Sequence, residues 1–262
     1  MADWNAEQYL KFMKERTQPA IDLVNRIQLE NPTKIIDIGC GPGNSTQVLA
    51  ARFPSAQILG IDSSENMIAT ARKQHPDLEF KVCDAANDLK NLGNDFDLVF
   101  SNACIQWIEN HQRLLPSMMG LLRNGGVLAV QTPMNYEEPI HKLIQEVTAL
   151  PKWRSSFPNQ RLFFNLTQEE YFDLLSEISP EFSMWQTTYF HIMKSHHDIL
   201  EWYRSTGLKP YLDELTDGEK ILFEQDIMEG IKSGYHQQIN GEIIFRFPRF
   251  FFTAVAQRAL GF

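Results

Sequence analysis

The chain has 262 residues, of which 43% are hydrophobic, and a formal net charge of −9 at pH 7. This length and composition allow one large domain with a sizeable core, and the negative charge argues against sequence-independent binding to nucleic acid or an anionic membrane. The N-terminus has no basic-then-apolar signal, and no apolar run approaches membrane-spanning length. Cys40, Cys83 and Cys104 lack metal-ligand spacing. We therefore expect a soluble, cytoplasmic protein whose three cysteines are buried as small apolar side chains.

The N-terminal segment predicts two helices. Over residues 3–16, two aromatic side chains share a helical face with Arg16, which suggests a short helix that closes over the site as a lid, residues 1–17. Residues 18–29 have an amphipathic pattern with Pro19 suited to a first helical turn. The alternative for the first helix is a terminal helix that only packs on the surface.

A strand, a glycine-rich turn and the start of a helix come next. Residues 34–38 (KIIDI) form a short apolar run, which predicts a strand buried on both faces. Glycines follow at alternate positions, where a Cβ would block close approach of a ligand to the backbone. The spacing DxGxGxG resembles the first motif of class I S-adenosylmethionine-dependent methyltransferases, whereas dinucleotide-binding loops read GxGxxG. A glycine-rich turn of another α/β protein is the alternative. The predicted cofactor-binding residues here are Asp37, Gly39, Gly41 and Gly43.

Acidic residues end the next two predicted strands, residues 56–62 and 78–82. Asp62 lies about twenty residues beyond the glycine turn, where a carboxylate can accept hydrogen bonds from both hydroxyls of a ribose. Asp84 directly follows the third strand and is predicted to reach an adenine amino group, with turn formation as its alternative role. Ser63, Met67, Ala85 and Asn102 complete the predicted cofactor-binding set.

The alternation of strands and helices continues to residue 132 and then loosens. Strands are predicted over residues 96–101 and 127–132, with a helix over 111–122 between them. We predict a doubly wound, mostly parallel seven-stranded sheet in one domain, with a cofactor-binding half (18–132) and a substrate half (133–262). In the second half, helices are predicted over 139–150, 168–177, 196–206, 211–215 and 218–233, and strands over 184–193 and 245–257. Residues of about 195–240 form a helical cap inserted between the last two strands.

The sequence is compatible with methyl transfer, in which the main task of the protein is to position the two reactants. Motifs of hydrolases are missing, and the histidines His191, His196 and His197 lack partners at ligand spacing, so no metal is predicted. An acceptor carboxylate is already ionised at neutral pH, so no general base is required. It needs cationic groups to hold it, and arginine matches a carboxylate at two points. The arginine candidates are Arg16, Arg154, Arg204, Arg246 and Arg249, with a solvated-charge role favoured for Arg154 and Arg204.

Motifs along nearly the full chain resemble the trans-aconitate 2-methyltransferase family. They include DWNAEQYLKF, DIGCGPGNST, GIDSSENMI, SNACIQW, TTYFHIMKSH and FPRFFFTA. The resemblance implies transfer of a methyl group from S-adenosylmethionine to one carboxylate of trans-aconitate, which yields a monomethyl ester and S-adenosylhomocysteine. It implies that Gly39, Asp62, Asp84 and Asn102 bind the cofactor, and that the acceptor is positioned by Arg16, Gln106, Trp107, Tyr189, His191, Trp202 and Arg249.

Two departures from the family pattern leave the preferred acid open. Gln18 stands where the family often has a second arginine, and Lys194 replaces a proline. Loss of one charge-assisted contact is worth roughly 1.5–3 kcal/mol, enough to change which acid is preferred. The alternatives are a methyltransferase for another acceptor such as a malonyl thioester, an NAD-dependent oxidoreductase, and a non-catalytic cofactor-binding module. We expect a small polycarboxylate substrate, no nucleic-acid or membrane partner, and a monomer or weak homodimer.

Overall fold

The computed structural model describes residues 13–158, 163–204 and 206–257. Their contacts divide the chain into two compact units, each built from separated segments. We call residues 13–133, 163–187 and 249–257 the sheet unit, and residues 134–158, 188–204 and 206–248 the helical unit. The predicted cofactor-binding half (18–132) lies wholly within the sheet unit. The roles assigned to the two halves stay predictions.

A seven-stranded sheet has the order β3-β2-β1-β4-β5-β7-β6. The first five strands pair in parallel, and β7 is antiparallel to β5. This arrangement confirms the predicted doubly wound, mostly parallel fold. The strands are β1 (Lys34–Ile38), β2 (Gln57–Asp62), β3 (Glu79–Val82), β4 (Phe96–Asn102), β5 (Leu122–Pro133), β6 (Phe182–Met193) and β7 (Ile243–Val255).

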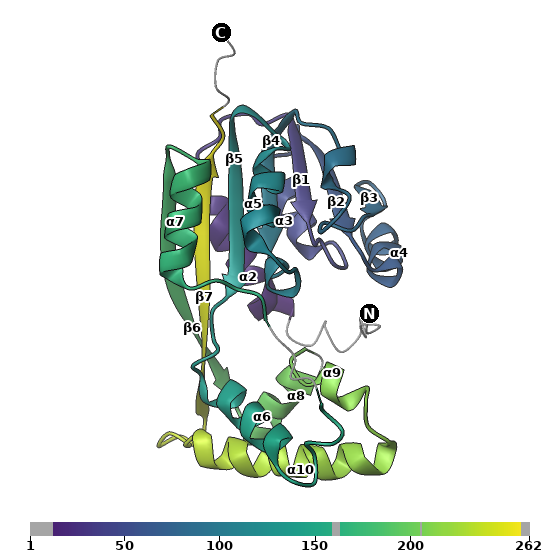
Figure 1. Cartoon of the computed structure of the whole chain (residues 1–262), viewed down its shortest axis with the longest axis vertical. Coiled ribbons are helices and arrows are strands. Elements are labelled where there is room, and N and C mark those ends of the chain that lie inside the picture. The colour runs from purple at the N-terminus through teal and green to yellow at the C-terminus, as the bar shows by residue number, and fades with distance from the viewer. Residues whose placement is uncertain (1–12, 159–162, 205, 258–262) are drawn as a thin grey trace. The chain divides into compact units, whose positions relative to one another are not determined.

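Helices flank the parallel strands on both sides (Figure 1). Ser64 begins one of them by accepting a hydrogen bond from the Met67 N–H, and Thr167 begins another in a reciprocal capping box with Glu170. Apolar side chains on the inner faces are buried, for example Leu23 and Leu115. The helices of the sheet unit are α2 (Met13–Arg26), α3 (Asn44–Arg52), α4 (Glu65–Gln74), α5 (His111–Met119) and α7 (Gln168–Ile178), with short 3₁₀ turns at Leu89–Asn91 and Ile105–Trp107.

Several predicted boundaries were wrong. The helix predicted to begin at residue 18 is part of α2, which starts at Met13 and contains Pro19 in its interior. Proline removes one intrahelical hydrogen bond, but the buried face that includes Leu23 favours a continuous helix despite this loss. The helix predicted over 111–122 ends at Met119, because Leu122 pairs with Phe96 at the start of β5. Residues 3–12 of the predicted lid lie outside the described residues.

Two further predictions were corrected in detail. The helix predicted over 211–215 is α9 (Lys209–Leu212). Among the cysteines, Cys40 and Cys83 are buried as expected, whereas Cys104 is half-buried.

The helical unit has a core of its own. It combines aliphatic side chains with aromatic ones. For example, the rings of Trp153 and Phe223 pack edge-on with centroids 5.4 Å apart, and the ring centroids of Trp202 and Phe245 lie 5.9 Å apart. A Cβ at Gly230 would lie 1.8 Å from Leu143, so only glycine allows α6 and α10 to pack this closely. The helices are α6 (Pro139–Ala149), α8 (His196–Arg204), α9 and α10 (Asp217–Gly234).

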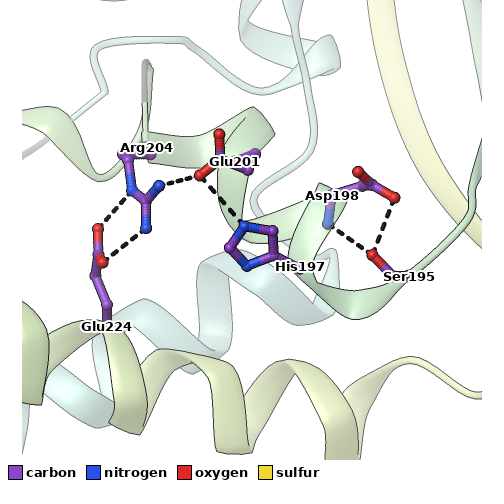
Figure 2. Close-up of polar contacts among 6 residues, drawn as sticks. All are labelled: Ser195, His197, Asp198, Glu201, Arg204 and Glu224. Carbon is purple, nitrogen blue, oxygen red and sulfur yellow. Dashed lines mark hydrogen bonds and ion pairs between the residues drawn. The ribbon is translucent and has the colours of Figure 1, made fainter.

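Arg204 joins two helices of this unit through carboxylates. Its Nε and Nη2 donate to the two carboxylate oxygens of Glu224 on α10, each at 2.7 Å, and Nη1 donates to Glu201 on α8 (Figure 2). Such a two-point contact fixes geometry as well as charge. Arg204 therefore joins α8 to α10, so the expected role of a solvated charge was wrong for this residue.

Candidate functional site

The glycine turn after β1 keeps a strained and open backbone. Gly39 has a φ of +75°, and a Cβ there would lie 2.2 Å from Sγ of Cys104. Gly41 has a φ of +53°, and nothing lies within 4 Å of where its Cβ would be. Gly39 is therefore required by packing, whereas Gly41 leaves space at which a ligand can approach the backbone. Gly43 precedes the first residue of α3.

Asp37 anchors this turn from inside the sheet. Its side chain is fully buried, and Oδ2 accepts hydrogen bonds from Ser45 Oγ and Thr46 Oγ1, both at 2.7 Å. Burial raises the pKa of Asp37 to about 6, because the charged form is poorly solvated there, although the two hydroxyls partly offset the effect. Asp37 thus ties the first turn of α3 to β1, and this contact supports a positioning role beneath the ligand.

Asp62 joins the end of β2 to the glycine turn. Its Oδ2 accepts from the Gly41 N–H at 3.0 Å, and Oδ1 accepts from the Ser64 N–H at 2.9 Å. Burial raises the pKa of Asp62, and the two N–H groups work in the opposite direction. Each carboxylate oxygen keeps a second acceptor site, so Asp62 can still receive ribose hydroxyls. Of its predicted neighbours in the set, Ser63 is exposed and Met67 is buried.

Asp84 forms a local turn after β3. Its Oδ1 accepts from the Ala86 N–H at 2.9 Å, and its Oδ2 accepts from Asn87 Nδ2 at 2.8 Å. This is the turn chemistry that the sequence held as the alternative role. Asp84 and Ala85 are half-buried, and their contact with a ligand stays a prediction.

Buried amides occupy the ends of β4 and β5. Asn102 is the last residue of β4, and its Oδ1 is buried without a hydrogen-bond partner in the part of the chain that the structure describes. Its register partner Gln131 on β5 is fully buried, and neither side-chain polar atom has a described partner. The sequence indicated Asn102 but gave no indication of Gln131, which lies within an otherwise apolar run.

The turn after β4 carries Gln106 and Trp107. Gln106 is buried, and its Nε2 donates to the Ala103 carbonyl at 2.7 Å, while its Oε1 lies 3.3 Å from Thr132 Oγ1. Trp107 packs on Phe163, with ring centroids 4.9 Å apart. Gln106 therefore helps to shape the turn, and Trp107 is the half-buried side chain next to it.

Asn165 extends this polar group from a distant part of the sequence. Its Oδ1 lies 3.1 Å from Thr132 Oγ1, and its Nδ2 donates to the Pro133 carbonyl at 2.6 Å. In addition, the Phe164 N–H donates to the Gln106 carbonyl at 3.1 Å. Sequence analysis missed Asn165, because no local pattern links a loop residue to a strand end some 30 positions earlier.

His111 contacts the turn that carries Gln106 and Trp107. Its ring lies between the Ile105 carbonyl, 2.9 Å from Nε2, and the Tyr171 hydroxyl, 2.7 Å from Nδ1. Because a carbonyl can only accept, Nε2 carries the hydrogen and Nδ1 accepts from Tyr171. Burial lowers the pKa of His111, which favours this neutral form. His111 was also missed, since a lone histidine at a helix start gives no signal of such a contact.

Three residues predicted to contact the acceptor come together within the helical unit. His191 lies 4.7 Å from Trp202 and 6.3 Å from Tyr189 between ring centroids. Tyr189 and His191 are half-buried, whereas Trp202 is buried. These aromatic rings form one cluster that joins β6 and α8.

The predicted arginines differ in their surroundings. Arg249 is 6% exposed and lies in the sheet unit, opposite Pro133 in the ladder of β5 and β7. Arg246 belongs to the helical unit and forms an ion pair with Glu138 at 3.3 Å. Arg154 is exposed, and Arg16 lies in α2 with a side chain outside the described set. Their contacts with an acceptor stay predictions, as do those of Gln106, Trp107 and the aromatic group on β6 and α8.

The described part of the chain has neither a cluster of metal-ligating side chains nor a helix that could span a membrane. Groups of three or more His, Cys, Asp or Glu side chains that could hold a metal ion are not found among the described residues. Likewise, within the described ranges, every helix is too short or too polar to cross a membrane.

Comparison with known proteins identifies the family. A methyltransferase-domain family model matches residues 35–126. Curated trans-aconitate 2-methyltransferases from Escherichia coli O157:H7 and Shigella flexneri are each 43% identical over 254 residues, which cover 97% of this chain and 98% of theirs. The chain belongs to the trans-aconitate 2-methyltransferase family. The match spans both the sheet unit and the helical unit, so it extends well beyond the domain common to methyltransferases.

Solved structures agree with the fold of this family member. The YcgJ protein from Bacillus subtilis has a TM-score of 0.59 at 13% identity, covering 92% of this chain and all of that chain. A phosphoethanolamine N-methyltransferase from Haemonchus contortus, bound to phosphomonomethylethanolamine and S-adenosylhomocysteine, has a TM-score of 0.55 at 18% identity, covering 92% of this chain and 53% of that chain. At these identities the likeness concerns the fold alone.

Proposed function

We propose that the protein transfers a methyl group from S-adenosylmethionine to a carboxylate of trans-aconitate or a similar small polycarboxylic acid. The observation that carries this proposal is the 43% identity to trans-aconitate 2-methyltransferases over 97% of the chain. The DxGxGxG turn at the end of β1 supports the same cofactor, since its spacing differs from that of dinucleotide-binding loops.

The residues around the glycine turn fit this cofactor. The backbone at Gly41 is open, Asp62 retains acceptor capacity for ribose hydroxyls, and Asn102 offers an unpaired carbonyl oxygen among the described residues. These groups would hold the ribose and the amino-acid end of the ligand. When bound, S-adenosylmethionine supplies an electrophilic methyl group on sulfur.

Positioning is the main task left to the protein. The acceptor carboxylate is ionised at neutral pH, so no residue has to remove a proton from it. We assign orientation of the acid to Arg16, Arg249 and the turn that carries Gln106 and Trp107. The carbon skeleton of the acid would be enclosed by Tyr189, His191 and Trp202. These side chains would also exclude water, which would otherwise hydrate the carboxylate and weaken its contacts with the arginines.

A methylation assay by mass spectrometry tests the proposal. Purified protein and S-adenosylmethionine are offered trans-aconitate, cis-aconitate, citrate, isocitrate and a malonyl thioester in parallel. We expect a monomethyl ester, formed preferentially from trans-aconitate. Ester formation only from the malonyl thioester would assign the acceptor to the alternative class, and binding of reduced nicotinamide without S-adenosylmethionine would refute the methyltransferase assignment.

The departure at Gln18 bears on which acid is preferred. Gln18 donates from Nε2 to Asp22 Oδ1 at 2.8 Å, one helical turn later, which is a structural use of this side chain. A Gln18→Arg variant is therefore expected to change relative turnover of the acids in the same assay without loss of the fold. The cytoplasmic location and the monomeric or weakly dimeric state stay predictions.

A further inference from the structure

Two adjacent side chains at the end of the parallel sheet have buried amide atoms without hydrogen-bond partners among the described residues. Gln131 is fully buried, and neither its Oε1 nor its Nε2 has a partner within the described ranges. Oδ1 of Asn102 is in the same condition. The two residues are register partners on β4 and β5, and neighbouring strands lie about 4.8 Å apart, so the amides are next to each other.

Both amides project from the face of the sheet that carries Asp37. Asp37 is the register partner of Phe100, and Asn102 follows Phe100 by two positions, which returns its side chain to the same face. Gln131 shares that face as the partner of Asn102. It is the face covered by α3, because Ser45 at the start of α3 bonds to Asp37.

The strand order places Gln131 next to the predicted cofactor site. Along the carboxyl edge the strands follow the order β2, β1, β4 and β5, so Asp62, the glycine turn, Asn102 and Gln131 come one after another. Ligands of open α/β sheets bind at this edge. Asp62 is assigned to the ribose and the glycine turn to the amino-acid end, so Gln131 is the next polar side chain along this edge, on the side away from Asp62.

An unpaired buried amide is unfavourable for folding, which points to a role in ligand binding. A buried polar group without a hydrogen bond lowers the free energy of unfolding compared with an apolar side chain of similar size. Asn102 Oδ1 and Gln131 Oε1 require a donor, and Gln131 Nε2 requires an acceptor. An ammonium group beside a carboxylate meets these needs, whereas either group alone does not.

We propose that Gln131 recognises the acceptor acid. Its Nε2 donates to a carboxylate of the acceptor that is not methylated, while its Oε1 and Asn102 Oδ1 accept from the ammonium of S-adenosylmethionine. A neutral amide suits this position, because it leaves no uncompensated charge in the core when the acceptor has left. This inference rests on the proposed function and adds a residue that sets specificity for acids.

The test compares Gln131→Met and Gln131→Glu with the wild-type enzyme. Gln131→Met keeps the size of the side chain and removes the donor, so we expect KM for the acid to rise about ten- to hundredfold, as for loss of a hydrogen bond to a charged group. We also expect Tm to rise, because an unpaired amide leaves the core. The Kd of S-adenosylmethionine, measured by calorimetry, should change by less than the KM for the acid.

Gln131→Glu keeps the acceptor atoms and adds a titratable group. As the new carboxyl ionises with rising pH, it repels the acid, so KM should rise with pH in this variant more steeply than in the wild type. Thr148→Val is the control for removal of a buried polar atom: the Thr148 hydroxyl donates to the Ile144 carbonyl at 2.9 Å, so Tm should fall while KM stays unchanged.

The outcomes separate this inference from the proposed function. An unchanged KM for the acid in Gln131→Met, with an active wild type, overturns the assignment of Gln131 alone. A tenfold weaker binding of S-adenosylmethionine with KM for the acid unaltered also overturns it, since Gln131 would then serve only the cofactor. If the wild type methylates only acceptors without a carboxylate, the proposed function fails and this inference fails with it.

Discussion

Replacement of Gly39 by alanine tests the packing of the glycine turn. A residue with a Cβ in the left-handed region costs roughly 1–2 kcal/mol at the φ of +75° found here. The new Cβ would also lie 2.2 Å from Sγ and 2.3 Å from Cβ of Cys104, and overpacking of this kind costs about 1–3 kcal/mol. Gly39→Ala should therefore lower the free energy of unfolding by about 2–5 kcal/mol.

Gly41→Ala is the matched control, because its φ of +53° is also left-handed but its Cβ would meet nothing within 4 Å. We expect a loss of only about 1–2 kcal/mol, measured by urea unfolding with an unchanged m-value, together with weaker binding of S-adenosylmethionine. A Cys104→Gly change should recover part of the loss in Gly39→Ala but none in Gly41→Ala. Equal losses in the two glycine variants, or a coupling energy near zero between Gly39→Ala and Cys104→Gly, would refute the reasoning.

Three further predictions concern buried charges. Burial alone would raise the pKa of Asp97, but hydrogen bonds, chiefly from Arg123 and the backbone, lower this pKa from 3.8 to about 2. The ionised Asp97 therefore contributes about 2.5 kcal/mol to the free energy of unfolding above pH 3.8, and this contribution is lost as the pH falls through 2. Asp97→Asn should abolish this acid dependence of the urea midpoint, and an unchanged profile would contradict it. Burial raises the pKa of Asp37 from 3.8 to about 6. The free energy of unfolding of the wild type should therefore fall by about 3 kcal/mol as the pH rises from 3.8 to 6, and the Asp37→Asn variant should not show this fall. Arg204→Met should lower stability by about 1–2 kcal/mol, through loss of its contacts with Glu224, without changing the Kd of S-adenosylmethionine; a change in that Kd without loss of stability would exclude the structural role.

Local sequence patterns were sufficient for the parallel part of the fold. The run KIIDI predicted β1 with its observed bounds, because a strand buried on both faces needs continuous apolar side chains. The acidic residue near the carboxyl end of the run indicated the edge of the sheet at which a ligand would bind. The position of Asp62 at the end of β2 followed from the same logic. The start of α2 was predicted wrongly because proline is favoured in the first turn of a helix. Only the buried face of α2 shows that the helix continues through Pro19.

Contacts between distant segments were beyond local patterns. His111 bonds to Tyr171 across 60 positions, and Asn165 bonds to the end of β5 across 32. In each contact, the residues around one partner show the same apolar spacing and turn residues whether or not the other partner is nearby. The contact therefore leaves no local pattern in the sequence. Gln131 was missed for a related reason: a polar residue in an apolar strand is visible in the sequence, but whether its amide is paired depends on the neighbouring strands.

Among the described residues, the helical unit comes from two stretches of chain, one within residues 134–158 and one within residues 188–248. A hybrid that exchanges the helical unit between members of this family would therefore need both stretches to be transferred together. The junctions at residues 187/188 and 248/249 fall inside β6 and β7, where a shift of one residue would turn every following side chain to the opposite face. Donor and recipient sequences for such a hybrid must consequently be aligned without a gap through both strands.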